Sequence, residues 1–144
     1  MKTSSRFVVA VHSLTALDLA PVIKRKETLS SEEIAESVNT HPVVIRRLLS
    51  SLRKAGLVTS QTGPGGGSKL ARHAEQITLL EVYQMVEDGR LFHLHYNTSN
   101  QACPIDSNIQ GVMDAVFSRA ENAVAGVLSE VTVAQVSEAI SERS

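Results

Sequence analysis

The fold is decided by residues 30–58, which read SSEEIAESVNTHPVVIRRLLSSLRKAGLV. Ser30 and Glu33 have the spacing of a capping box, in which each side chain accepts a hydrogen bond from the other residue's free backbone amide. The box predicts a short helix that begins at Ser31 and ends at the polar break of residues 38–40. A polar interruption of this kind favours a tight turn before the next helix.

A second helix is expected from Pro42, because the first helical position does not need the amide hydrogen that proline lacks. This leaves His41 as the N-cap, and Gly56 is expected to end the helix. Apolar residues recur at i, i+3, i+4 and i+7, as one buried stripe requires: Ile45, Leu48, Leu49 and Leu52. The opposite face is cationic and holds no carboxylate: Val43, Arg46, Arg47, Ser50, Arg53 and Lys54.

Residues 57–61 and 68–71 favour two antiparallel strands. Their connection, TGPGGG at 62–67, lacks the Gly-Lys-Ser/Thr ending of a phosphate-binding loop, so a nucleotide site is not expected. A glycine-rich hairpin tip instead lets the backbone approach another surface closely. Upstream, an amphipathic helix is expected from Arg6 to Leu19, stopped by Pro21. The order helix, helix, turn, cationic helix and hairpin predicts a winged helix-turn-helix in a mainly α (α+β) protein.

The 144-residue chain divides by charge. Residues 1–75 carry eleven Lys and Arg against six Asp and Glu, a net charge of +5, whereas residues 76–144 carry three against nine, a net charge of −6. Such asymmetry suggests that the front part meets a polyanion. We therefore expect a DNA-binding domain at 1–75 that contacts double-stranded DNA, and a second unit at 76–144.

The second unit is expected to hold a long helix between two short ones. Thr78 with Glu81, and Thr132 with Gln135, repeat the capping box. Asp106 or Ser107 is expected to cap the long helix, whose apolar stripe spans about 33 Å, too long for one small core to cover. A second copy is the expected partner, so the stripe predicts a homodimer; a helix packed on its own winged domain is the alternative. The expected dimerisation residues are Ile109, Val112, Met113, Val116, Phe117, Ala120, Val124, Val127 and Leu128.

Several function classes find no support. A hydrolytic triad or paired-carboxylate signature does not stand out, so an enzyme is not expected. No run of eighteen apolar residues or signal-peptide cleavage site is evident, which predicts a cytoplasmic protein without a membrane partner. The single cysteine, Cys103, excludes an intrachain disulfide.

Five stretches resemble the Rrf2 family of bacterial winged-helix repressors: EIAES at 33–37, LRKAGLV at 52–58, GPGGG at 63–67, ITLLEV at 77–82 and CPI at 103–105. That family includes regulators of iron–sulfur assembly, nitric-oxide sensors and repressors of cysteine metabolism. The resemblance implies a homodimer joined by the long helix, with the last helix packed on the partner, bound to a roughly palindromic operator.

The sequence departs from the family pattern at two places. Cluster-binding relatives carry three closely spaced cysteines before the long helix, and here only Cys103 is present, matching the last of them. An iron–sulfur cluster is therefore not expected, and the likeness is to the cluster-free branch. Several relatives place arginine before the wing glycines, where this chain has Thr62, so either Lys69 compensates or the wing contacts are weaker.

The residues and the resemblance together nominate a set of DNA contacts. Arginines on the cationic helix suit guanine in the major groove, and the other polar groups suit phosphates; a merely solvated basic face is the alternative. The set is Arg6, Ser31, Thr40, His41, Val43, Val44, Arg46, Arg47, Ser50, Lys54, Gly65, Gly66 and Lys69.

Sensing is expected around residues 92–104, where an unknown effector would act. The dipole of the following helix favours a reactive Cys103 thiolate and hence a redox sensor. A structural cysteine packed beside Pro104 deserves equal weight. Cys103 with His93 and His95 makes a weak metal candidate, and no metal is expected. The rival function is an interaction module that docks on a metabolic enzyme through its basic face.

Overall fold

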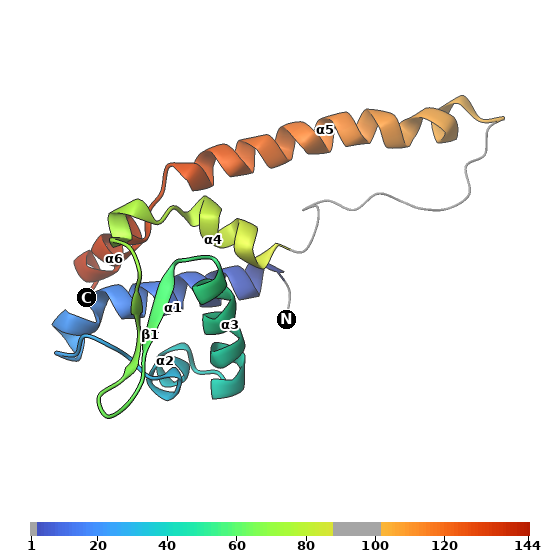
Figure 1. Ribbon diagram of the computed structural model, residues 1–144. Coiled ribbons are helices and arrows are strands. Elements are labelled where there is room, and N and C mark those ends of the chain that lie inside the picture. The colour runs from blue at the N-terminus through green and yellow to red at the C-terminus, as the bar shows by residue number, and fades with distance from the viewer. Residues whose placement is uncertain (1–2, 88–101) are drawn as a thin grey trace.

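The computed structural model describes residues 3–87 and 102–144, which form a mainly helical molecule with one small sheet (Figure 1). The mainly α class and the two-stranded wing are therefore confirmed. The elements are α1 (Thr3–Ile23), α2 (Ser31–Val38), α3 (Pro42–Lys54), β1 (Val58–Gln61), β2 (Gly67–Leu70), η1 (Ala74–Gln76), α4 (Leu79–Val86), α5 (Pro104–Ser129) and α6 (Val133–Glu142).

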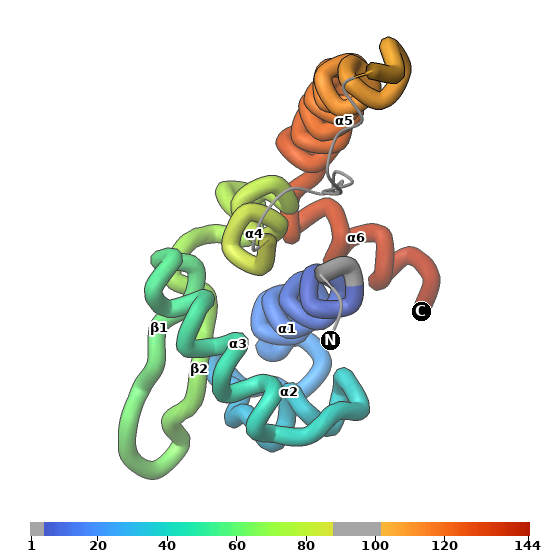
Figure 2. The backbone as a smooth tube through the Cα atoms, turned by 90° about the vertical axis from the view of Figure 1, so that its right-hand side faces the viewer, coloured from blue at the N-terminus to red at the C-terminus, as the bar shows by residue number. Residues whose placement is uncertain are grey.

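Helix α1 lies at the centre of the core, with α2, α3, α4 and α6 around it (Figure 2). Leu14 and Ala10 are fully enclosed in this core. The expected stop at Pro21 is wrong, because α1 continues to Ile23. Proline removes one amide donor and crowds the preceding turn, but in the last turn of a helix the rest of the ladder persists. The Lys24 amide, three residues after Pro21, still donates to the Ala20 carbonyl at 2.9 Å.

Residues 5–23 of α1 are long and apolar enough to cross a membrane by length and composition. The core helix of a globular protein passes the same test. Four of its apolar side chains are buried against the surrounding helices: Ala10, Leu14, Leu17 and Ala20. We therefore interpret α1 as a core helix.

The helix-turn-helix forms as its caps predict. Ser30 Oγ accepts the Glu33 amide at 3.1 Å, and the Glu33 carboxylate accepts the Ser30 amide at 3.1 Å. Asn39 takes the left-handed conformation that ends α2, with φ of 64°. His41 caps α3 through Nδ1, which accepts the Val43 amide at 3.2 Å. The turn is thus held by its own side chains.

The wing is a hairpin in which Val58 pairs with Leu70 and Gln61 with Gly67. Its second strand also bridges to the start of the helix-turn-helix, where the Ser68 amide bonds the Leu29 carbonyl at 2.8 Å. A Cβ on Gly67 would lie 2.6 Å from the Leu29 carbonyl oxygen. Glycine is therefore required for this close approach, which fixes the wing beside α2 and α3.

Helices α4 and α6 begin side by side. Thr78 and Thr132 both form complete capping boxes, and the two residues face each other in a β-bridge. Helix α6 then packs on α1 of its own chain, with Val133 fully buried. The bridge at Thr132 thus returns the chain to its own core, and packing of the last helix on a partner stays a prediction.

Helix α5 extends away from this body, beyond α4 (Figures 1 and 2). It begins at Pro104 with Cys103 as N-cap, three residues before the expected cap Asp106 and four before Ser107, because proline suits the first helical position. None of its side chains is buried. The alternative of a long helix covered by its own winged domain is therefore not what this chain adopts.

The apolar stripe of α5 has two edges. One edge is half-buried and holds Met113, Phe117, Ala120, Val124 and Leu128. Helix α5 also contacts α4. The other edge, which we call the open edge, follows the helical spacing i, i+4, i+7 and i+11 and is exposed: Ile105, Ile109, Val112 and Val116, with Val127 one further repeat along.

Candidate nucleic-acid interface

Helix α3 buries one face and exposes the other. Ile45 and Leu52 are fully buried, and Leu49 nearly so. The expected contact residues lie around the remaining surface. His41, Val43, Arg46, Arg47 and Lys54 are exposed, whereas Thr40, Val44 and Ser50 are half-buried. The amphipathic pattern thus directs the cations outward, as a groove-binding helix requires.

Arg46 does not stand free on this surface. Its Nη2 donates to Glu32 Oε1 at 2.8 Å, joining α3 to the first turn of α2. The hydrogen bond from Arg46 lowers the pKa of Glu32, with the backbone amide of Glu32 as the next cause. Glu32 was not among the expected site residues, because the turn brings it against Arg46 from 14 positions away. The Glu32 carboxylate therefore lies beside the cationic face of α3.

A hydrogen bond couples α3 to the wing. Arg53 Nη1 donates to Ser60 Oγ on β1 at 3.0 Å. Both residues line a hollow of about 330 Å³ between α2, α3 and the wing, which Arg46 and the expected contact Ser31 also line. Two arginines and the start of α2 thus converge on one hollow, an arrangement suited to a phosphate.

The wing tip is anchored rather than loose. Thr28 Oγ1 donates to the Gly65 carbonyl at 3.0 Å, and both Gly65 and Lys69 are exposed. Gly66 was expected to let the backbone approach DNA, but the fold itself already requires glycine at this position. A Cβ there would meet the Gln61 carbonyl oxygen at 2.3 Å, so the residue is required by the wing's own turn.

Arg6 of α1 lies near α3, although it is 41 positions from Arg47 in the sequence. Both line a hollow of about 370 Å³, together with Val44 and Leu48 of α3 and Met85 of α4. Arg6 is half-buried and Arg47 exposed. The structure thus brings the first helix's arginine to the edge of the same cationic surface.

The donor set does not fit an iron–sulfur cluster held by this chain's cysteines, because Cys103 is the sole thiol of the sequence. It lies half-buried at the N-cap of α5, and its role as a redox sensor stays a prediction. Within residues 3–87 and 102–144, no group of three or more His, Cys, Asp or Glu could hold a metal ion. His93 and His95, and most of the expected effector region at 92–104, lie outside the described residues.

Comparison with known proteins identifies the family that this chain resembles. A family model for Rrf2, described as an iron-dependent transcriptional regulator, matches residues 3–139. YwnA of Bacillus subtilis (strain 168), which is named as an HTH-type transcriptional regulator, is 40% identical over 134 residues, covering 92% of this chain and 95% of YwnA.

Two further relatives carry the name IscR. The HTH-type transcriptional regulator IscR of Cereibacter sphaeroides is 38% identical over 88 residues, or 61% of this chain and 56% of that protein. The solved structure of T. potens IscR shares the fold, with a TM-score of 0.73 at 24% identity over 99% of this chain and 90% of that chain. The chain therefore belongs to the Rrf2 family, whose members are transcriptional regulators and not enzymes.

Proposed function

We propose that this protein is a sequence-specific regulator that binds double-stranded DNA through α3. The observation that carries the proposal is the exposed pair Arg46 and Arg47, on a helix whose other face is anchored in the core. A rigid helix that presents guanidinium groups can enter the major groove and bond guanine bidentately. The wing, with Lys69 exposed on β2, would contact the flanking backbone.

The same proposal assigns the DNA contacts to residues 1–75 and dimerisation to residues 76–144. The open edge of α5 supports a homodimer, because Val112 and Val116 are 59% and 46% exposed on a helix that extends away from its own body. Two antiparallel copies would bury these edges against each other. Their recognition helices would then enter successive major grooves about 34–36 Å apart on a palindromic operator.

Repression is the expected outcome of occupying an operator in this way. With a single thiol in the chain, the protein is proposed to work without an iron–sulfur cluster of its own. The effector region is proposed to lie near the start of α5, and the bacterial cytoplasm is the expected location.

The test is selection of bound duplexes from a random library, followed by titration of the selected operator. Replacing Arg46 and Arg47 with glutamine should weaken operator binding at least about thirtyfold, since each bidentate base contact contributes about 1–3 kcal/mol. The double replacement of Arg25 and Arg143 makes the same charge change away from α3 and should leave binding nearly unchanged. Equal losses in the two variants would mean that bulk charge, not α3, binds DNA. A library without any enriched duplex at low salt would contradict the proposal and favour a protein-docking module.

A further inference from the structure

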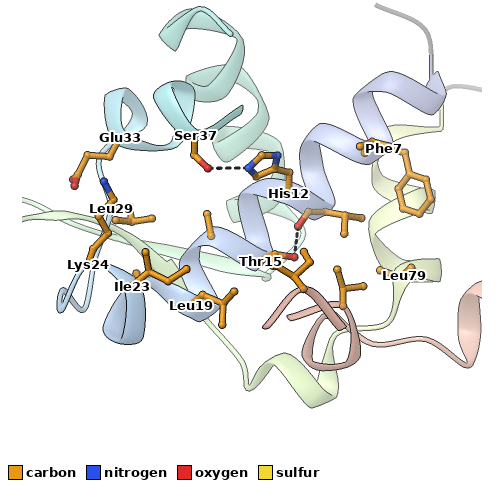
Figure 3. Close-up of a pocket in the computed structure, with 16 residues that line it drawn as sticks. Phe7, His12, Thr15, Leu19, Ile23, Lys24, Leu29, Glu33, Ser37 and Leu79 are labelled. Carbon is orange, nitrogen blue, oxygen red and sulfur yellow. Dashed lines mark hydrogen bonds between the residues drawn. The ribbon is translucent and has the colours of Figure 1, made fainter. Parts of the chain in front are cut away.

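A groove of about 570 Å³ runs along α1, with α2 on one side and α6 on the other (Figure 3). Its size lies within the range of small-molecule sites. Most of the lining is hydrocarbon, contributed by α1 together with Leu29, Leu79 and two residues of α6, Val136 and Ile140.

The groove walls are incompletely covered. Val8 and Ile23, which both line it, are 65% and 67% exposed, and Ile140 is 43% exposed. Apolar side chains left open beside a concave surface gain free energy when a ligand removes them from water, at about 25 cal/mol per Å². The groove therefore favours an apolar ligand body.

Polar groups along the floor are satisfied within the chain. His12 Nε2 and Ser37 Oγ lie 2.8 Å apart in a hydrogen bond, and Thr15 Oγ1 donates to the Val11 carbonyl at 2.7 Å. A ligand therefore needs no polar group at the middle of the groove, because these polar side chains already hydrogen-bond within the chain.

The two ends of the groove differ in chemistry. Figure 3 shows Lys24, Leu29 and Glu33 at one end, and Phe7 and Leu79 at the other. Each carboxylate oxygen of Glu33 already has a partner, because Oε1 accepts from the Ser30 amide at 3.1 Å and Oε2 from Lys26 Nζ at 2.8 Å. The ammonium group of Lys24 has no ion pair among the residues that the structure describes.

This end therefore has an available positive charge and an occupied negative one. A cationic ligand group would have to compete with Lys26 for Glu33, whereas a carboxylate could bind the Lys24 ammonium group without breaking an ion pair. We propose that the groove binds an apolar monocarboxylate, such as a medium-chain fatty acid, with its carboxylate on Lys24 and its hydrocarbon body on the α1–α6 wall.

Occupancy has a structural consequence that rests on the proposed function. The ligand would contact α2 through Ser37 and α6 through Val136, and α6 follows directly on the end of α5. A filled groove would therefore set the helix-turn-helix relative to the end of α5, and so would change operator affinity from a second place besides the start of α5.

Calorimetric titration of the full chain with octanoate, without DNA, tests the binding step. We expect a dissociation constant below about 0.1 mM, and at least tenfold weaker binding of octanamide, which has the same hydrocarbon body but no charge. Lys24→Gln should reduce octanoate to the level of octanamide, whereas Lys54→Gln, the same charge change on α3, should leave both unchanged. Ala16→Phe, which fills the groove from α1, should abolish binding of both, with circular dichroism confirming that the variant folds.

Three results would overturn the proposal: no heat up to 1 mM octanoate, including the case in which a second copy covers the groove; equal affinity for acid and amide; or an unchanged preference in Lys24→Gln. This titration contains no DNA. Its result therefore does not depend on whether the protein binds an operator, and the two proposals can fail separately. Octanoate binding without any change in affinity for the selected operator would retain the site and remove its regulatory role.

Discussion

Arg46 Nη2 and Glu32 Oε1 are joined at 2.8 Å across the turn of the helix-turn-helix. The guanidinium of the recognition helix is therefore held by a carboxylate of the preceding helix before any DNA arrives. The pair is exposed on both sides, so its value to stability is small. We expect the pair to affect DNA binding instead. The Glu32 carboxylate repels phosphates, and its hydrogen bond restrains the side chain of Arg46.

Glu32→Gln should accordingly raise affinity for random-sequence duplex DNA and narrow the ratio between operator and random DNA. Freed Arg46 would then neutralise a phosphate, steepening the dependence of log K on log salt by about one. Fluorescence anisotropy over a salt series measures both quantities. Glu36→Gln, on an exposed position of the same helix, is the matched control. An unchanged slope and unchanged ratio would show that Glu32 is only a spectator.

Val116→Glu should convert the proposed dimer into a monomer. Dimerisation would bury the new carboxylate on the open edge of α5 without an opposite charge beside it, which costs free energy. Sedimentation equilibrium gives the mass directly. Ser118→Glu, an exposed position two residues further along α5 and off the apolar stripe, should leave the mass unchanged. If the two variants sediment alike, the open edge is not the dimer interface.

Loss of operator affinity should follow loss of the dimer. Val116→Glu is expected to bind a full palindrome no better than a single half-site, whereas the unaltered protein should prefer the palindrome strongly. A gel-shift titration with both duplexes separates the two cases. Retained preference in a proven monomer would contradict the symmetric arrangement.

Ser30→Ala should lower the free energy of unfolding by about 1 kcal/mol, since it removes the hydroxyl that accepts the Glu33 amide at the start of α2. Urea unfolding followed by circular dichroism measures the change. Ser118→Ala, within α5 and remote from any cap, serves as the control and should change stability little. A cost below a few tenths of a kcal/mol would mean that packing alone fixes α2.

Acid should remove the contribution of the Lys26–Glu33 pair. The hydrogen bond from Lys26, followed by that from the Ser30 amide, lowers the pKa of Glu33 below its ordinary value of 4.5. The pair therefore stabilises the fold above that value and is lost as pH falls through the lower, folded-state pKa. The stability difference between the unaltered protein and Lys26→Gln should be present at pH 6 and shrink below pH 4.5. A difference that does not shrink at all as the pH falls below 4.5 would assign the effect of Lys26 to packing.

Local signals in the sequence predicted the element starts well where a side chain itself supplies the missing hydrogen bond. All three capping boxes, at Ser30, Thr78 and Thr132, form as the spacing predicts. Proline was the less certain marker. Pro21 lies inside α1 and Pro104 begins α5 earlier than expected, because the cost of proline depends on its distance from the helix end.

The candidate site was predicted in part for the same reason. Arg46, Arg47 and Lys54 follow from helical periodicity, which fixes the side of α3 on which each residue lies. Glu32 beside Arg46 and Arg6 beside Arg47 do not, because their separations of 14 and 41 positions carry no periodic signal.

The amino-acid order by itself determined the helix caps, the cationic face of α3, the wing and the apolar stripe of α5, since each depends on hydrogen bonds or periodicity within a few residues. Only the tertiary structure decided that α6 returns to its own α1, that half of the α5 stripe stays open, and that a groove with one available ammonium group lies along α1. These features depend on which surfaces meet in space, and packing between distant segments is set by the whole core at once.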